Sequence, residues 1–431
     1  MAKKPNTPAT EAPAVSEQPY YLQRAHIKDY RSIRDAKVEF KPGLNIIIGA
    51  NGSGKTNFVR VAKNAISGAH ANQLGSDNKF VFSGQHSVEI KIFREAKRDK
   101  YNDTITSLLD INKWLTTVEI DGLQFKGEDF HKSWVGVNYK RAVKGFGNKI
   151  VRPDSPILIN HGVPLDYKLV SEPMNLSIEP NLSGMPDIKN QFVRVVIDGI
   201  FLSLLFLNKY EIVNLVEHAD DKAVKHLVDK VINFNLIRIK TNLTKFSPIN
   251  DVRLVDSARV YINTLQNEVI VQGLVLEFSI DGKWLPFNAM SSGTQRLFYI
   301  ISEILSPISF YLIKDSKEGF LLKESTQTIL LEEPELGIHP DQLYKLLLFL
   351  REQSEKHQII ITTHSPQVLD MLTSDELDRI TICELDEKKG TQFRKLTKKK
   401  IATAQKFMKD VGYLSDFWLY SSLEEKGPFA S

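Results

Sequence analysis

Residues 44–57 read LNIIIGANGSGKTN, an apolar run that leads directly into a glycine-rich loop and then into helix-compatible sequence. The loop matches the pattern G-x-x-x-x-G-K-[ST] between a strand and a helix, the context that makes this pattern specific. Its glycines let backbone N–H groups surround phosphate oxygens, and the start of the helix adds positive potential. The predicted nucleotide-binding residues are Gly49, Asn51, Gly52, Ser53, Gly54, Lys55, Thr56 and Asn57.

Two side chains of this loop have distinct predicted tasks. Lys55 would reach the terminal phosphates of a nucleoside triphosphate, and the Thr56 hydroxyl would be a ligand for Mg2+. A glycine-rich turn that binds nothing would not account for the full spacing and its context. We therefore expect ATP and Mg2+ as cofactors.

A second apolar run ends in adjacent carboxylates, since residues 328–335 read TILLEEPE. An acid at the end of a buried strand can hold Mg2+ or its waters, and the next acid can polarise a water for in-line attack on a phosphate. We assign the metal to Glu332, where Asp is the usual residue, and the water to Glu333. Alone, such a pair is more often a solvated strand end, but the phosphate loop favours the catalytic interpretation.

A third apolar run ends in a histidine, since residues 359–366 read IIITTHSP. An isolated histidine is usually structural. One strand-helix unit beyond Glu333, however, His364 could contact the terminal phosphate or orient the attacking water. We predict a catalytic role for His364.

Residues 290–296 read MSSGTQR and precede a helical pattern, with serines that can cap the helix and a glycine that permits close backbone approach. This segment resembles a variant of the ABC signature motif Leu-Ser-Gly-Gly-Gln, from which Ser292 and Thr294 depart. In ABC ATPases the signature of one subunit caps the nucleotide bound by the other. The resemblance therefore implies that Ser291, Ser292 and Gly293 bind nucleotide in trans, in a head-to-tail homodimer.

The segments YRSI at residues 30–33, GLNI at 43–46 and GKTN at 54–57 resemble the RecF, SMC and OLD branch of these ATPases. AAA-type ATP-binding proteins of this kind occur in prokaryotic anti-phage defence systems. The resemblance implies that Arg31 touches the nucleotide, although a plain surface role is equally compatible with its position. It also implies a glutamine that senses magnesium, for which Gln73, Gln85 and Gln124 remain alternatives.

The expected fold class is α/β, an ABC-type P-loop NTPase head with an antiparallel β lobe and an inserted, mainly helical subdomain. The expected division is a disordered tail over 1–20, an N-terminal lobe with the P-loop over 21–133, a partly helical insert over 134–250 and a C-terminal lobe over 251–431. Apolar residues recur at helical spacing within 188–235, and no heptad repeat is sustained. A long coiled-coil arm is therefore not expected.

Composition constrains the setting of the protein. The formal net charge of +4 over 431 residues is too small to predict nucleic-acid binding by itself. Cys383 is the one cysteine, which excludes an internal disulfide. The apolar segment at residues 192–207 is interrupted by charges and is shorter than the roughly 20 residues that a membrane helix needs. We expect a cytoplasmic protein with no membrane partner.

The predicted activity is hydrolysis of ATP to ADP and phosphate. The main hypothesis is an ATPase whose nucleotide-dependent dimerisation controls a separate effector, a nuclease or toxin, in anti-phage defence. The alternative is a RecF-like repair ATPase that clamps duplex DNA, with a basic run over 388–400 as a candidate contact. The aromatic segment at residues 411–420 could pack on its own domain or hold a partner chain.

Overall fold

The computed structural model describes residues 21–67, 77–83, 88–96, 112–120, 123–128, 157–159, 161, 174–178, 220–255, 259–265, 268–305, 311–313, 321–323 and 327–421. The predicted disordered tail at 1–20 and the apolar segment at 192–207 lie outside these residues, as do Gln73 and Gln85.

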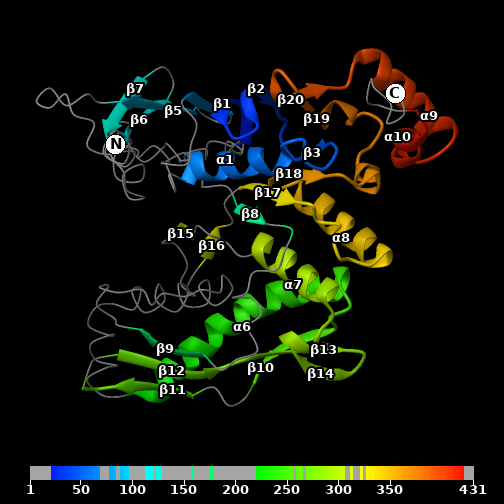
Figure 1. Ribbon diagram of the computed structural model, residues 1–431. Coiled ribbons are helices and arrows are strands. Elements are labelled where there is room, and N and C mark those ends of the chain that lie inside the picture. The colour runs from blue at the N-terminus through cyan, green and yellow to red at the C-terminus, as the bar shows by residue number, and fades with distance from the viewer. Residues whose placement is uncertain are drawn as a thin grey trace, which may run out of the picture.

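A sheet of 12 strands dominates the described chain (Figure 1), and the five strands at one end of it are parallel. Five neighbouring strands run in one direction: β19 (Ile380–Asp386), β3 (Leu44–Ile48), β18 (Gln358–Thr363), β17 (Thr328–Glu332) and β8 (Ile157–Ile159). Every residue of β3, β17 and β18 is buried. Continuous apolar, β-branched runs of this kind are typical of parallel strands that are covered on both faces.

The other half of the sheet is antiparallel, as expected. Its strands are β7 (Leu123–Glu128), β6 (Asn112–Ile120), β5 (Val88–Ala96), β4 (Asp77–Ser83), β1 (Tyr21–Tyr30), β2 (Ile33–Glu39) and β20 (Gly390–Lys395). Buried residues recur at alternate positions along much of β1 and β2, because these strands cover a core on one face. The strand order places β7 and β8 at opposite edges of the sheet.

Helices cover both faces of the parallel part of the sheet. α1 (Lys55–Ser67) contributes Phe58 and Val59 to an apolar core that also contains Ile47 of β3. Ile46 and Ile48 face the opposite core, which is formed with α6 (Asp221–Phe246), α7 (Ser292–Leu305) and α8 (Pro340–Gln353). Because alternate residues of β3 enter different cores, the position of the strand is fixed from both sides.

α6 packs against α7 and α8 and carries two small sheets at its far side (Figure 1). The helical spacing predicted within residues 188–235 is confirmed for the part that α6 covers. The buried positions of α6 include Val224, Val228, Ile232, Leu236, Ile239, Leu243 and Phe246. The small sheets have the orders β10-β13-β14 and β11-β12-β9. Their strands are β9 (Met174–Ile178), β10 (Asp251–Leu254), β11 (Arg259–Asn263), β12 (Glu268–Leu274), β13 (Leu276–Ile280) and β14 (Lys283–Pro286).

Two details differ from the expected organisation. The sequence of residues 269–280, followed by a turn signal at Asp281-Gly282, predicts one strand of a hairpin with residues 283–287. Instead, Gly273 takes a φ of +73° and the run splits into β12 and β13, which belong to different sheets. Within the range expected for a helical insert, β8 joins the main sheet and β9 pairs with β12. The described part of that range therefore contributes one strand to the main sheet and one to a small sheet, and its longest element is the helix α6.

The remaining elements are short or lie at the C-terminal end. They are β15 (Tyr311–Ile313), β16 (Leu321–Lys323), the 3-10 turns η3 (Phe287–Ala289), η4 (Pro366–Met371) and η5 (Leu377–Arg379), and the helices α9 (Lys398–Asp410) and α10 (Leu414–Ser421). α10 packs on η4, and Ser415 donates to Asp370 through both its N–H and its hydroxyl. Among the described helices, none is both long and apolar enough to cross a membrane.

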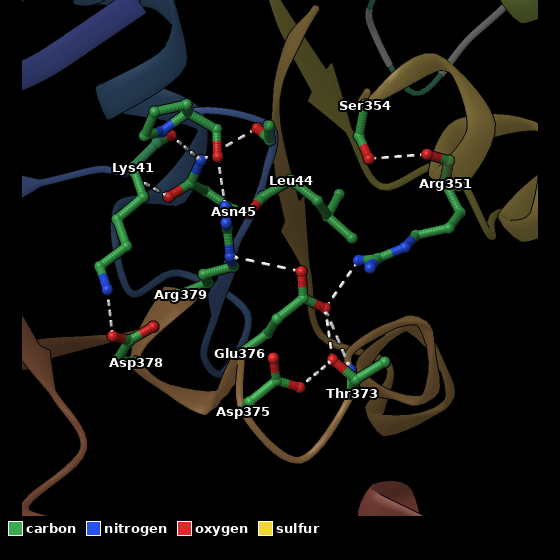
Figure 2. Close-up of polar contacts among 12 residues, drawn as sticks. Lys41, Leu44, Asn45, Arg351, Ser354, Thr373, Asp375, Glu376, Asp378 and Arg379 are labelled. Carbon is green, nitrogen blue, oxygen red and sulfur yellow. Dashed lines mark hydrogen bonds and ion pairs between the residues drawn. The ribbon is translucent and has the colours of Figure 1, made fainter. Parts of the chain in front are cut away.

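A polar network fixes the edge of the sheet where the parallel strands begin (Figure 2). Glu376 accepts a hydrogen bond from Arg351 of α8 at 2.7 Å and one from the Thr373 N–H at 3.1 Å. It also pairs with Arg379 at 3.5 Å, and Arg379 donates to the carbonyl of Leu44 at 3.1 Å. One carboxylate thus ties α8 to the first residue of β3.

Replacing this carboxylate should lower stability in a pH-dependent manner. Burial opposes ionisation of Glu376, but the hydrogen bonds from Arg351 and Thr373 outweigh it and hold the pKa of Glu376 below its usual range. Glu376→Gln should destabilise the fold by about 2 kcal/mol at neutral pH, because hydrogen bonds to a charged partner are lost. A depressed folded pKa stabilises above the unfolded value, so the difference should shrink as the pH falls below about 4.

Thermal unfolding of Glu376→Gln and of the wild type across a pH series measures this difference. Glu355→Gln, at an exposed position just after α8, is the matched control and should unfold with the wild type. Equal melting temperatures for Glu376→Gln and the wild type at pH 7 would contradict the proposed role of the network.

Candidate functional site

Polar residues gather where four neighbouring parallel strands end. β3 leads into the glycine-rich loop, β18 into His364, β17 into Glu333 and β8 towards His161. The register pairs Ile48 with Thr363 and Glu332 with Thr362. Because parallel strands present their carboxyl ends at one edge, residues more than 200 positions apart in the sequence share one site.

The glycine-rich loop holds its lysine in a nearly buried position. Lys55 is 5% exposed, and its Nζ donates to the carbonyls of Gly49 at 2.8 Å and Ala50 at 3.0 Å. Burial lowers the pKa of Lys55, against the opposing effect of nearby groups that include Glu333 and Glu335. Asn51 and Gly52 of the loop are exposed, whereas the Lys55 side chain is nearly buried.

The loop is held from the side by Thr391 of β20. The Thr391 hydroxyl donates to the Ser53 carbonyl at 2.9 Å and lies so close to Gly54 that any side chain there would collide with it. Gly54 also has a φ of +110°, which an L side chain rarely adopts. Position 54 therefore requires glycine for both backbone and packing reasons.

Arg31 lies beside the phosphate loop. It takes a φ of +52° in the tight β1–β2 turn, and its guanidinium donates to Asn57 Oδ1 at 3.4 Å. Asn57 in turn donates to the Ser32 hydroxyl at 2.8 Å, which contacts the Thr391 hydroxyl at 2.8 Å. The β1–β2 turn, α1 and β20 are thus linked around the loop, and the proposal that Arg31 touches nucleotide keeps a structural basis.

The two residues assigned to the metal meet directly. The Thr56 hydroxyl donates to Oε1 of Glu332, whose side chain is 3% exposed. The second oxygen, Glu332 Oε2, is buried and has no hydrogen-bond partner. Oxygen ligands are those that Mg2+ prefers, and a buried carboxylate oxygen without a donor is costly unless a cation completes it. The pair therefore fits a magnesium site.

Glu333 and His364 also lie together. His364 Nδ1 is 3.4 Å from Glu333 Oε1 and 3.8 Å from Glu335 Oε1. Glu333 has a φ of +44°, an uncommon backbone conformation for a residue with a long side chain. Its N–H donates to the Thr362 carbonyl of β18 at 2.8 Å. This turn directs the Glu333 carboxylate towards the histidine, while Glu332 stays in the strand.

Glu335 is a third carboxylate that the sequence did not assign. Its side chain is 7% exposed, and it accepts a hydrogen bond from the Thr363 hydroxyl at the end of β18. Its Oε2 is buried without a hydrogen-bond partner. Glu335 therefore ties the loop after Glu333 to the strand that carries His364.

Arg296 of α7 holds this loop by its backbone. The guanidinium donates to the carbonyls of Glu333 at 2.8 Å, Glu332 at 3.1 Å and Pro334 at 3.5 Å, and also to that of His161. Burial lowers the pKa of Arg296 to about 10, which leaves it charged at neutral pH. One buried cation thus satisfies the carbonyl groups at the ends of β17 and β8.

The signature-like segment lies at the start of the same helix. The Ser291 hydroxyl accepts from the Thr294 N–H at 3.2 Å and so caps α7, while Ser291 and Ser292 remain exposed. A Cβ on Gly293 would lie 2.8 Å from the Gly337 carbonyl, so glycine is required where α7 meets the loop after Glu335. His339 caps α8, because its side chain accepts a hydrogen bond from the Asp341 N–H.

The roles of several residues in this site were not predicted from the sequence. Thr391 and Arg296 carry no motif of their own, because their roles depend on which strands and helices become neighbours. His161 had a weak signal, since it follows the short apolar run at residues 157–159 as His364 follows its strand. Its Nδ1 lies 3.5 Å from Glu332 Oε2.

Two family models match parts of this chain. A family described as "AAA domain, putative AbiEii toxin, Type IV TA system" matches residues 203–370, and a second, described as "AAA domain", matches residues 24–142. These two segments contain the phosphate loop, the signature-like segment, the acidic strand end and the histidine. The chain contains an AAA/ABC-type P-loop ATPase domain.

Relatives of the chain include a Septu protein and DNA replication and repair proteins. The Septu protein PtuA of Bacillus thuringiensis is 24% identical over 369 residues, which cover 84% of this chain and 76% of that protein. RecF of Streptococcus agalactiae is 37% identical over 70 residues, or 16% of this chain, and the match spans 19% of the RecF length. The ATPase domain therefore shares only a limited segment with RecF.

Solved structures of SMC heads match this chain at low similarity. The SMC head bound to the C-terminal winged-helix domain of ScpA has a TM-score of 0.47, 14% sequence identity and coverage of 89% of this chain and 99% of that one. A second head, bound to the C-terminal domain of ScpA from Pyrococcus furiosus, has a TM-score of 0.45 and the same identity.

The hydrogen bonds from Arg296 to backbone carbonyls predict that a substitution at this position affects the turnover number for ATP and not the affinity for ATP. Lys at position 296 keeps the charge but cannot present donors to four carbonyls at once. Arg296→Lys should retain ATP affinity, because Lys55 and the loop are untouched, and should lower the turnover number about 10- to 100-fold through misplacement of the catalytic loop.

Steady-state kinetics of the wild type and of Arg296→Lys measures the turnover number and the Michaelis constant for ATP separately. Arg253→Lys, at a partly exposed arginine on β10, is the matched control and should behave as the wild type. If Arg296→Lys lost ATP affinity and kept its turnover number, the guanidinium would not position the catalytic loop.

Proposed function

We propose that this protein hydrolyses ATP to ADP and phosphate as a head-to-tail homodimer, and that nucleotide-dependent dimerisation controls a separate nuclease or toxin in anti-phage defence. The observation that supports hydrolysis most strongly is the meeting of Thr56 with Glu332, and of Glu333 with His364, at one edge of the sheet. A structural loop would not need these two pairs beside a buried lysine.

The residues of the site can divide the reaction between them. Lys55 and the N–H groups of the loop bind the phosphates and stabilise the charge that develops on the transferred group. Glu333 orients a water and accepts its proton, and His364 holds the Glu333 carboxylate in place. Thr56 and Glu332 would hold Mg2+, which neutralises phosphate charge when bound.

Dimerisation is proposed from the position of the signature-like segment. Ser291 and Ser292 are exposed at the N-terminus of α7, whose positive end suits an anion. A second copy that presented this end to the phosphates would complete each site. Arg296 of the same helix donates to the Glu333 carbonyl of its own chain, so dimerisation would affect the sites of both copies.

The defence role and the effector rest on the similarity to a Septu protein along 84% of the chain. Exposed apolar side chains near the C-terminus are a candidate contact for the effector. Tyr413, Leu419 and Tyr420 are 69%, 66% and 84% exposed, whereas Leu414 and Phe417 of the same segment are buried. The segment at residues 411–420 therefore both packs on its domain and leaves an apolar surface.

Two substitutions test the catalytic assignment. Lys55→Ala should weaken ATP binding at least about tenfold, because charged hydrogen bonds to the phosphates are lost. Glu333→Gln should retain ATP but slow hydrolysis about a hundredfold or more, which is the contribution of a general base. It should also accumulate as a dimer in the presence of ATP.

Nucleotide-binding titrations, phosphate release and light scattering measure these effects. Lys37→Ala, an exposed lysine on β2, is the matched control for charge removal and should leave binding and hydrolysis unchanged. Hydrolysis at the wild-type rate by Glu333→Gln would refute the assignment of the base.

A RecF-like DNA clamp is the second candidate, because several RecF proteins match part of the chain. The basic run does not form one free strip: Arg394 pairs with Glu384 through two donors, and burial lowers the pKa of Lys395 to about 8. Lys398 and Lys399 are exposed at the start of α9. This distribution favours the effector hypothesis over the clamp.

Hydrolysis measured with and without duplex DNA distinguishes the two candidates. We expect little change on adding DNA at any salt concentration, with Glu333→Gln as the blank. Stimulation that is strong at low salt and falls steeply as salt rises would indicate phosphate-backbone contacts and favour the clamp.

A further inference from the structure

His161 lies beside Thr56 and Glu332, two residues after the end of the short strand β8. β8 pairs in parallel with β17, and Ile159 is opposite Leu331, so the chain two residues later passes the end of β17. His161 Nδ1 is 3.5 Å from Glu332 Oε2, the buried oxygen that has no hydrogen-bond partner. An imidazole nitrogen and an orphaned carboxylate oxygen therefore face one another.

This separation suits two ligands of a single cation. Adjacent ligands of an octahedral ion with bonds of about 2.1 Å lie about 3 Å apart, so a shift of roughly half an ångström would bring both into place. The His161 side chain is 56% exposed and has room to move, while its backbone carbonyl is held by Arg296. The backbone is thus fixed and the ring is adjustable.

We propose that His161 donates Nδ1 directly to the divalent cation held by Thr56 and Glu332. The site then has one nitrogen ligand among oxygen ligands. His161 takes the magnesium-sensing role for which a glutamine was expected. Gln124 lies on β7, at the opposite edge of the sheet from β8, whereas His161 is next to the acidic strand end. This inference rests on the proposed nucleotide function of the site.

A nitrogen ligand changes which cation the site prefers. Mg2+ favours oxygen ligands, whereas imidazole suits first-row transition metals. The preference of the wild-type site for Mn2+ over Mg2+ in nucleotide binding should therefore be greater than that of a site with oxygen ligands alone. Gln at position 161 offers an oxygen of similar reach and should restore the preference for Mg2+.

Pulsed electron paramagnetic resonance of bound Mn2+ gives the direct test. The full chain is labelled with 15N-histidine and saturated with Mn2+ and ATPγS, and the nitrogen coupling to the manganese is recorded. We expect a histidine 15N coupling in the wild type and its loss in His161→Gln. His364→Gln, which removes the other nearby imidazole, should keep the coupling.

The outcomes separate this inference from the proposed function. A bound Mn2+–nucleotide complex with no histidine coupling, or with a coupling that disappears only in His364→Gln, would overturn the role of His161 and leave the nucleotide site intact. Failure of the wild type to form any Mn2+–nucleotide complex would overturn the nucleotide site itself.

Metal preference gives a second, independent readout. Nucleotide binding is titrated with Mn2+ and with Mg2+, and the ratio of the two half-saturating concentrations is compared between wild type and His161→Gln. We expect the preference for Mn2+ to fall at least about tenfold, as for the loss of other groups around metal sites. An unchanged ratio in a variant with wild-type circular dichroism would contradict the proposal.

Discussion

The site depends on the register of four parallel strands. Backbone hydrogen bonds align β3, β18, β17 and β8, so that their carboxyl ends lie at one edge. A slip of one residue would shift a side chain by about 3.3 Å and turn it to the opposite face. The two cores oppose such a slip, because Ile46 and Ile47 of one strand must enter different cores. Packing far from the nucleotide thus sets the distances within the site.

Strand ends impose a second requirement, since their carbonyl groups lose their partners where the ladder stops. Arg296 meets this requirement by donating to carbonyls after both β17 and β8. It also compensates for the uncommon backbone conformation of Glu333, which costs of order 1–3 kcal/mol and persists only where neighbouring contacts enforce it. Because Gly293 of the same helix touches the Gly337 carbonyl, α7 and the catalytic loop are coupled twice. Movement of the signature-like segment would therefore displace the catalytic carboxylate.

Local chemistry explains which features the sequence predicts. The glycine-rich loop, the acidic strand end and His364 each follow a fully buried strand, so their apolar runs and polar ends are visible without knowledge of neighbours. Thr391, Arg296 and His161 acquire their roles only from strand order and helix packing. β8 has three residues, too few for periodicity, and the split between β12 and β13 depends on one glycine with positive φ. The pattern of residues 269–280 alone does not show where the run divides. The division follows from tertiary structure, because β12 pairs with β11 and β13 pairs with β10.

The charge balance of the site favours the proposal that a nucleotide and a divalent cation bind there together. Glu332, Glu333 and Glu335 place three carboxylates near two buried cations, Lys55 and Arg296, whose pKa values are both lowered chiefly by burial. Arg296 is committed to backbone carbonyls, so Lys55 is left to meet the phosphates. A triphosphate without a metal would add several negative charges in a region of low dielectric, where repulsion is strong. A divalent cation between Glu332 and the phosphates removes this repulsion, so each ligand should raise the affinity of the site for the other.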